Sequence, residues 1–244
     1  MTKMFGNMST DGLEVQGDRL GGGGVVETNY YDAVIKVAYA GKASSSNAQS
    51  ITYVLDLDGR EMRETQWITN RNGDNFYLSK DGKNTKHLLP GAEIIDELCL
   101  VTTGLPLSEQ DFEEKIVNIY DFDAKKEVPT AVMVPIAMIG KDVGAAIVRQ
   151  TVDKQKKEGN TYVNTGETRD ENVVEKFFHA ESGRTVTEIR EGIEAPVHKP
   201  KWIEKNAGKT RNRAKGAEGK TGAPGSKPAG APGAAPKTTP SLFG

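Results

Sequence analysis

The sequence predicts a β-rich fold, a small antiparallel barrel with one helix between its third and fourth strands, followed by a disordered basic tail. Three observations support this prediction. Short apolar, β-branched and aromatic segments alternate with turn signals, one long amphipathic segment interrupts them, and the composition changes near residue 194. A parallel α/β sheet would need a helix after nearly every strand, and this chain shows no such alternation.

The first three strands are predicted near the N-terminus. Residues 31–40 and 50–57 alternate or run apolar and are separated by a small polar stretch. The dipeptide Asp58-Gly59 favours a tight hairpin, because a type I′ turn requires positive φ angles. Residues 60–69 then continue as a third strand that we expect to pair with the second.

A polar ribbon or loop and then a helix follow. Residues 70–86 are polar around the ring pair Phe76 and Tyr77, as in an exposed loop or ribbon. Pro90 suits the first turn of a helix whose apolar residues share one side, and Gly104 is expected to end it.

The second half of the chain predicts further strands. Residues 115–121, 128–139 and 143–152 are extended segments, and Pro129 and Pro135 mark the middle one as an edge or bulged strand.

The remaining segments complete the predicted domain. Residues 154–170 form a charged, Gly-containing excursion, whereas residues 173–178 and 185–189 fit either a strand or a short helix. A helix between strands three and four is the order of an OB fold. The predicted division is a flexible leader over 1–28, an OB-fold-like domain over 29–193 and a disordered basic Pro/Gly/Ala-rich tail over 194–244.

Charge and cysteine content exclude several classes of protein. The net charge of −2 hides an asymmetry: residues 199–244 hold ten Lys or Arg against two acids, about +8, which leaves about −10 for the rest. The single Cys99 and three histidines do not supply a structural zinc site or a disulfide. Neither a signal peptide nor an apolar membrane span is recognisable, so we expect a cytoplasmic protein without membrane contact.

Basic and aromatic residues gather in three groups, which is what single-stranded nucleic acid needs when it is bound without sequence readout. Each group also has a structural alternative. The first could pack over the barrel mouth, the second could belong to the sheet core, and the third could be a solvated loop. The first group is Trp67, Arg71, Phe76, Tyr77, Lys80, Lys83 and Lys86; the second is Lys36, Tyr39 and Tyr53; the third is Lys141, Arg149, Lys154, Lys156, Lys157, Tyr162 and Arg169.

Catalytic patterns are weak by comparison. Gly140-Lys141 lacks the remaining residues of a phosphate-binding loop. Residues 56–59 resemble the start of a calcium loop, but Trp67 stands where its last acid is required. Acids near His179 fit a polar surface better than a metal or general-base cluster. We therefore predict no enzyme activity and no cofactor. A metal-dependent nuclease is a weaker alternative hypothesis.

Two features distinguish the predicted tail. Its basic first part suits non-specific, salt-sensitive phosphate contact. Its end contains the apolar pair Leu242 and Phe243, which a disordered tether could offer to a pocket of a partner protein. The alternative is a terminus without a role.

Four stretches of the chain carry a resemblance to a known family. They are GAEIIDELCLVTTGLPLSEQDFEE at 91–114, VRQTVD at 148–153, NTGETRDENVVEKFF at 164–178 and NAGKTRNRAK at 206–215. These stretches resemble those of bacteriophage single-stranded DNA-binding proteins. The resemblance implies an OB-fold body that coats single-stranded DNA during phage replication, recombination and repair inside the host cell, and a C-terminal segment that recruits replication or recombination proteins. The basic tail departs from the acidic tails common in such proteins.

The resulting hypothesis is non-specific binding of single-stranded DNA by stacking and phosphate contact. The rival hypothesis is a non-catalytic phage structural or protein-interaction module with a basic tail. The sequence does not indicate an oligomeric state.

Overall fold

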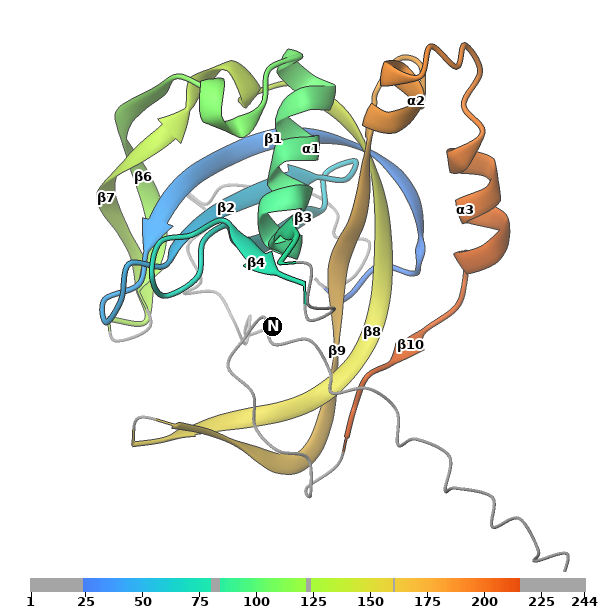
Figure 1. Ribbon diagram of the computed structural model, residues 1–244. Helices are drawn as coiled ribbons and strands as arrows, with labels where there is room; N and C mark the ends of the chain where they lie inside the picture. The colour runs from blue at the N-terminus through green and yellow to red at the C-terminus, as the bar shows by residue number, and fades with distance from the viewer. Residues whose placement is uncertain (1–23, 80–83, 122–123, 160, 216–244) are drawn as a thin grey trace, which may run out of the picture.

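A long, twisted antiparallel sheet organises the molecule (Figure 1). The computed structural model describes residues 24–79, 84–121, 124–159 and 161–215. The strands of the sheet follow the order β3-β2-β1-β8-β9, with a short β10 pairing parallel to β8 beyond the end of β1. Their bounds are β1 Asn29–Lys42, β2 Gln49–Asp56, β3 Glu61–Trp67, β8 Asp142–Glu158, β9 Thr161–His179 and β10 Arg211–Asn212.

The β-rich, mostly antiparallel class predicted from the sequence is confirmed. Within the described residues the sheet does not close into a barrel, because no backbone ladder joins β3 to β9. The predicted turn between β2 and β3 has φ angles of 56° at Asp58 and 82° at Gly59, as a type I′ hairpin requires.

The helix α1 (Pro90–Thr103) is confirmed after the third strand of the sheet. It begins with Pro90 and ends at Gly104, whose φ of 77° is left-handed and whose N–H donates to Leu100 O. Gly91 is required at the start of the helix, since a Cβ there would lie 2.3 Å from Trp67 O. This close approach fixes α1 against the end of β3.

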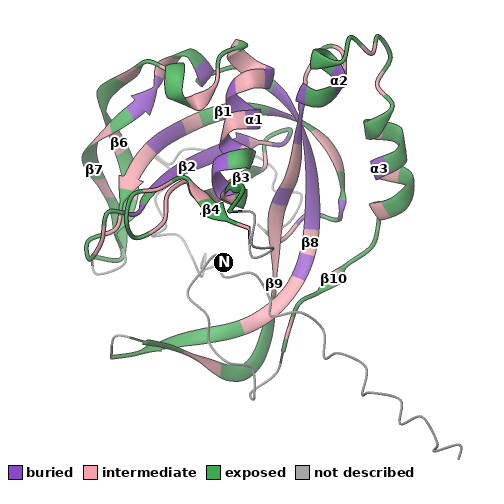
Figure 2. Ribbon diagram, viewed as in Figure 1, coloured by how far each residue is buried: buried purple, intermediate pink, exposed green. Residues whose placement is uncertain are grey.

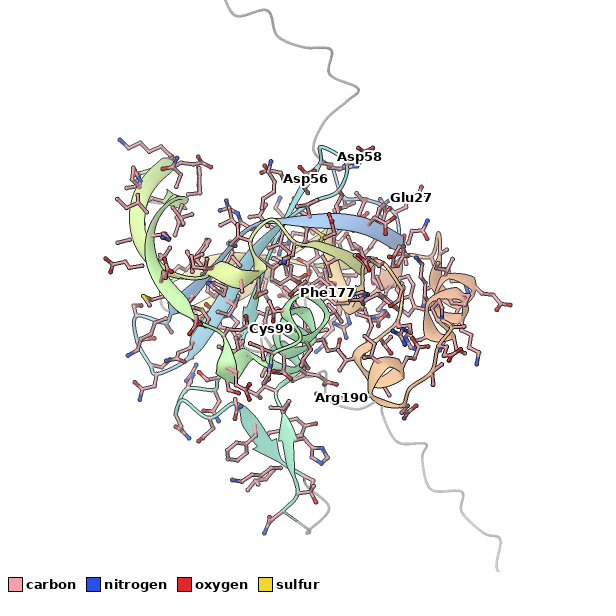
Figure 3. The ribbon with its side chains drawn as sticks, turned by 90° about the horizontal axis from the view of Figure 1, so that it is seen from above. Glu27, Asp56, Asp58, Cys99, Phe177 and Arg190 are labelled. Atoms are coloured by element: carbon pink, nitrogen blue, oxygen red, sulfur yellow. The ribbon has the colours of Figure 1, made fainter. Side chains whose placement is uncertain are left out.

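The core lies between α1 and the inner face of the sheet (Figure 2). Ile95, Leu98 and Cys99 of α1 are completely buried against Phe177 of β9, and Figure 3 shows Cys99 and Phe177 close together at the centre of the molecule. Burial of a side chain of this size contributes about 1.5–3 kcal/mol. The same burial raises the pKa of the Cys99 thiol to about 12, so this cysteine stays protonated.

Two hairpins project from the sheet, in agreement with the predicted ribbon at 70–86 and the predicted extended segments at 115–121 and 128–139. The first joins β4 (Phe76–Leu78) to β5 (Lys86–Leu88), and the second joins β6 (Phe112–Asp121) to β7 (Lys126–Pro135). Single 3-10 turns, η1 (Leu107–Glu109) and η2 (Ile136–Met138), flank the second hairpin.

The segments left undecided by the sequence take different forms. Residues 173–178 are part of β9, whereas α2 (Val186–Arg190) is a short helix. Thr185 accepts a hydrogen bond from Glu188 N, and the Glu188 carboxylate accepts one from Thr185 N. This capping box satisfies two backbone donors, which explains why five residues suffice for a helix here.

Ordered residues extend past both predicted domain boundaries. Residues 24–28, assigned to the leader, contain the buried Val26 and Thr28, and Val26 N donates to Asn172 Oδ1. Residues 194–215, assigned to the tail, form α3 (His198–Asn206) and β10. The described body therefore extends to residue 215, and residues 1–23 and 216–244 lie outside it.

Candidate nucleic-acid interface

The distal halves of β8 and β9 form a two-stranded arm, defined here as residues 152–159 and 161–169. On the other side of β8, β1 pairs as far as Ile147 and β10 covers Gln150 and Thr151, so the arm has no third strand among the described residues. It extends away from α1 and α2 and curves below the body in Figure 1. The register shifts between Asp153 and Gln155, which bends the arm near its base.

The end of the arm brings a ring and a cation together. Lys157 and Tyr162 are direct cross-strand partners, so their side chains share one face. Tyr162 is 49% exposed. Among the described residues no carboxylate lies within ion-pair distance of Lys157. This pair offers a base-stacking surface beside a phosphate-binding charge.

The other cations of the arm are held by acids. Lys154 Nζ lies 2.8 Å from Glu167 Oε2, Lys156 pairs with Glu158 at 2.7 Å, and Arg169 pairs with Glu171 at 2.9 Å. Exposed pairs of this kind contribute about 0.2–1 kcal/mol each, so phosphate can displace the acid at small cost.

Arg149 has a structural role at the base of the arm. Its guanidinium donates twice to Asp170 Oδ2, at 2.9 and 2.6 Å, while Thr151 Oγ1 donates to Oδ1 at 2.6 Å. The hydrogen bonds from Thr151 and Arg149 lower the pKa of Asp170. This network ties β8 to β9 where the arm leaves the sheet, and it holds Arg149 away from any other ligand.

The segment after α3 adds cations that were predicted to lie in the disordered tail. Glu175 accepts from Trp202 Nε1 at 2.9 Å and from Arg211 Nη2 at 2.7 Å. Although burial raises the pKa of Glu175, these bonds lower it overall. Trp202 is only 7% exposed, and it anchors α3 on the outside of β8 and β9.

Two of these additional cations lie at the base of the arm. Arg213 N donates to Thr151 O at 2.8 Å, and Lys215 N donates to Asp153 Oδ2 at 2.8 Å. No ion pair engages the side chain of Arg213 or Lys215 among the described residues. Trp202 and Ile203 within a Lys-rich stretch were the sequence signal for this ordered segment.

The predicted site at 67–86 is a separate ribbon with internal partners. Tyr77 stacks on His87 at 5.5 Å between ring centroids, and Lys86 Nζ lies 4.2 Å above the ring of Phe76. Tyr77 remains 43% exposed and Trp67 37% exposed. Arg71 is exposed at the preceding turn, and its carbonyl accepts from Asn47 N. Lys80 and Lys83 lie outside the described residues.

The second predicted group is wrong as a binding site. Tyr53 is completely buried and donates from its hydroxyl to Glu64 Oε2 at 2.7 Å, and Tyr39 is 8% exposed. A base cannot stack on either ring. Lys36 is exposed but pairs with Glu61 at 2.7 Å and Asp56 at 3.7 Å.

Lys141 does not join the arm cations. It is exposed in the turn before β8, at the opposite end of that 17-residue strand from the end of the arm. At about 3.3 Å per residue, the two ends are separated by about 50 Å along the strand. The third predicted group therefore divides into Lys141 at one end, Arg149 in a structural network, and the arm.

Glu64 connects the two edges of the sheet. Its Oε2 accepts from Val174 N of β9 at 2.9 Å as well as from Tyr53, and its Oε1 accepts from Gln66 Nε2 at 2.7 Å. Burial raises the pKa of this carboxyl to about 7 despite those donors. Glu64 thus links β3 to β9 just above the arm.

Neither a metal centre nor a membrane helix was found in the described part of the chain. Its His, Cys, Asp and Glu residues form no group of three suited to a metal ion, and none of its helices is long and apolar enough to span a bilayer. No family model, curated protein or solved structure matches this chain.

Proposed function

We propose that this protein binds single-stranded DNA without sequence preference and without catalysis, as an OB-type body acting in phage DNA replication, recombination and repair. The observation that carries the proposal is the arm, with Tyr162 and Lys157 as cross-strand neighbours and Arg213 and Lys215 at its base. Rings beside cations on a two-stranded projection suit bases that stack and phosphates that pair.

The topology supports the same proposal. Strands β1, β2 and β3 form a meander, α1 follows, and β8 returns beside β1 before β9. This strand order is consistent with an OB fold, in which the hairpin between the last two strands is one of the binding loops. The arm occupies that place, whereas β4–β5 and β6–β7 are insertions before and after α1.

The charge distribution is consistent with a local groove rather than a uniformly basic surface. The arm holds four Lys or Arg and three acids, so it contributes a net charge of only +1. Residues 198–215 hold seven Lys or Arg and one acid, and this segment runs to the base of the arm. Attraction of DNA therefore depends on α3 and the ordered segment that follows it.

The direct test is fluorescence anisotropy with a labelled oligothymidine at several salt concentrations. Binding that weakens steeply with salt supports the proposal, and no binding at low salt contradicts it. The same titration with an oligouridine shows whether the protein prefers DNA or RNA. Incubation with magnesium and a labelled strand tests catalysis, because progressive cleavage would make the protein a nuclease.

The contribution of residues 216–244, which include the apolar pair Leu242 and Phe243, requires a different test. Both residues lie outside the described part of the chain. A truncation after Lys215 removes them and leaves α3 and β10 in place. We expect the truncated protein to retain DNA binding, while loss of binding would assign the DNA contact to residues 216–244.

A further inference from the structure

A row of exposed cations continues from the base of the arm toward α3. The chain runs from α3 through β10 to the arm, along the right side of Figure 1. Lys201, Lys205 and Lys209 are all exposed in this segment. Lys201 and Lys205 stand four residues apart on α3, so their side chains lie on the same side of the helix. The row therefore joins the helix to Arg213 and Lys215 at the base of the arm.

Among the described residues, Lys201 and Lys205 have no carboxylate within ion-pair distance. Glu204 is the only acid of residues 198–215 and is itself exposed. Lys199 of the same helix differs, because its Nζ lies 3.5 Å from the centre of the Tyr30 ring. Like charges four positions apart destabilise a helix slightly. An anion bound on this side of α3 would relieve that repulsion, so the row favours a ligand with repeated negative charges.

The backbone that carries these cations is held against the sheet. Gly208 N donates to Thr28 O at 2.8 Å, and Thr28 Oγ1 donates to Lys209 O at 2.6 Å. The same hydroxyl accepts from Arg149 N at 2.8 Å, so it bridges β8 to the segment after α3. The cations are therefore presented from a fixed backbone. A ligand that binds them loses less conformational entropy than it would on a mobile run of lysines.

The row is long enough to add a second contact region to the arm. From Lys201 to Lys215 the chain spans at most about 40 Å, at about 1.5 Å per helical residue and about 3.3 Å per extended residue. We propose that a single strand bound at the arm continues along this row to α3, where Lys201 and Lys205 contact its phosphates. Phosphate contacts of this kind need no base readout. The extension rests on the proposed function, because it takes the arm as bound to the same strand.

Anisotropy titrations with oligothymidines of two lengths test the proposal. Lengths of about 6 and about 16 nucleotides lie near the two ends of the site sizes of single OB folds. The double variant Lys201→Ala/Lys205→Ala should reduce the slope of log Kobs against log salt by about 1.4 for the long strand, the value for two phosphate contacts. The slope for the short strand, which the arm binds, should not change. Alanine favours a helix, so α3 should persist, and circular dichroism checks this.

A second double variant controls for the loss of charge alone. Lys42→Ala/Lys126→Ala removes two exposed lysines at the end of β1 and the start of β7, across the molecule from α3 in Figure 1, and should leave both slopes unchanged. An unchanged slope for the long strand in Lys201→Ala/Lys205→Ala overturns the proposal, and so does an equal change for both lengths. If wild type binds neither strand, the proposed function itself is contradicted, and this extension with it.

Discussion

The β4–β5 hairpin and the arm of β8–β9 have similar composition but differ in what their side chains contact. In the hairpin, Tyr77 stacks on His87 and Lys86 lies over Phe76, so rings and cations satisfy each other. In the arm, Tyr162 is exposed beside Lys157, which has no acid partner among the described residues. Identical residue types are therefore more available to a ligand in the arm.

The two regions also differ in how they are supported. The arm continues strands of the main sheet and receives α3 and β10 along β8, with Glu175 bonded to Trp202 and Arg211. The hairpin is an independent two-stranded sheet. A binding element has higher affinity when its position is fixed before the ligand arrives, because less conformational entropy is lost on binding. If the protein binds DNA as proposed, we therefore expect the arm to make the main contact.

The largest expected effect comes from removing the anchor of α3. Trp202→Ala should destabilise the protein by about 3–5 kcal/mol, since a buried ring and its bond to Glu175 are both lost. Urea denaturation followed by circular dichroism measures this. Trp202→Phe, which keeps most of the packing, should cost much less. Equal losses for the two variants would show that packing of the ring does not hold α3.

The link between β3 and β9 should make stability depend on pH. The pKa of Glu64 is raised from 4.5 to about 7 on folding, chiefly by burial. Its contribution is therefore complete below pH 4.5 and is lost as the pH rises through about 7, which amounts to about 3 kcal/mol. Urea denaturation at pH 5 and pH 8 should show this loss, and Glu64→Gln should reduce it. An unchanged pH dependence in Glu64→Gln contradicts this assignment.

The two ribbons should respond differently to loss of a ring. Tyr162→Ala should weaken binding of oligothymidine by about 1–3 kcal/mol, the usual contribution of one stacked base. Tyr77→Ala is the matched change in the hairpin and should weaken binding less, because His87 already covers part of its ring. Anisotropy titrations of both variants measure the difference. A larger loss for Tyr77→Ala would reverse the assignment.

The smallest expected effects concern single cations. Lys157→Ala and Arg213→Ala should each reduce the slope of log Kobs against log salt by about 0.7, the value for one phosphate contact with a single strand. Lys126→Ala removes a cation from the β6–β7 ribbon and should leave the slope unchanged. If all three variants give the same slope as wild type, the cations of the arm and the following segment do not contact phosphate.

Local patterns in the sequence predicted the elements well, and long-range packing explains where prediction failed. The turn at Asp58-Gly59 and the helix from Pro90 to Gly104 follow from local backbone preferences. Tyr53 shares its face of β2 with the buried Ile51 and Leu55, so the sheet core, which was the alternative for this ring, is its actual position. The Glu64 carboxylate that accepts from its hydroxyl lies on the neighbouring strand, and this partner cannot be predicted from β2 alone.

The boundary predicted at residue 194 excluded ordered residues for a related reason. Lysines dominate residues 199–215, and their composition predicts disorder. Trp202 nevertheless orders this segment, because its partner Glu175 lies on a strand 27 positions earlier. The sequence predicted part of the candidate site, including Tyr162 and Lys154, from residue types alone. It did not predict the cations after α3, because only tertiary contacts bring them to the arm.

Hydrogen–deuterium exchange with and without oligothymidine most directly tests whether the arm is the main DNA contact. Exchange is followed by mass spectrometry in peptides that cover the arm, residues 211–215 and residues 76–88. We expect slower exchange on DNA binding in the arm and at 211–215, with little change at 76–88. Protection confined to residues 76–88, with the arm unchanged, would contradict it.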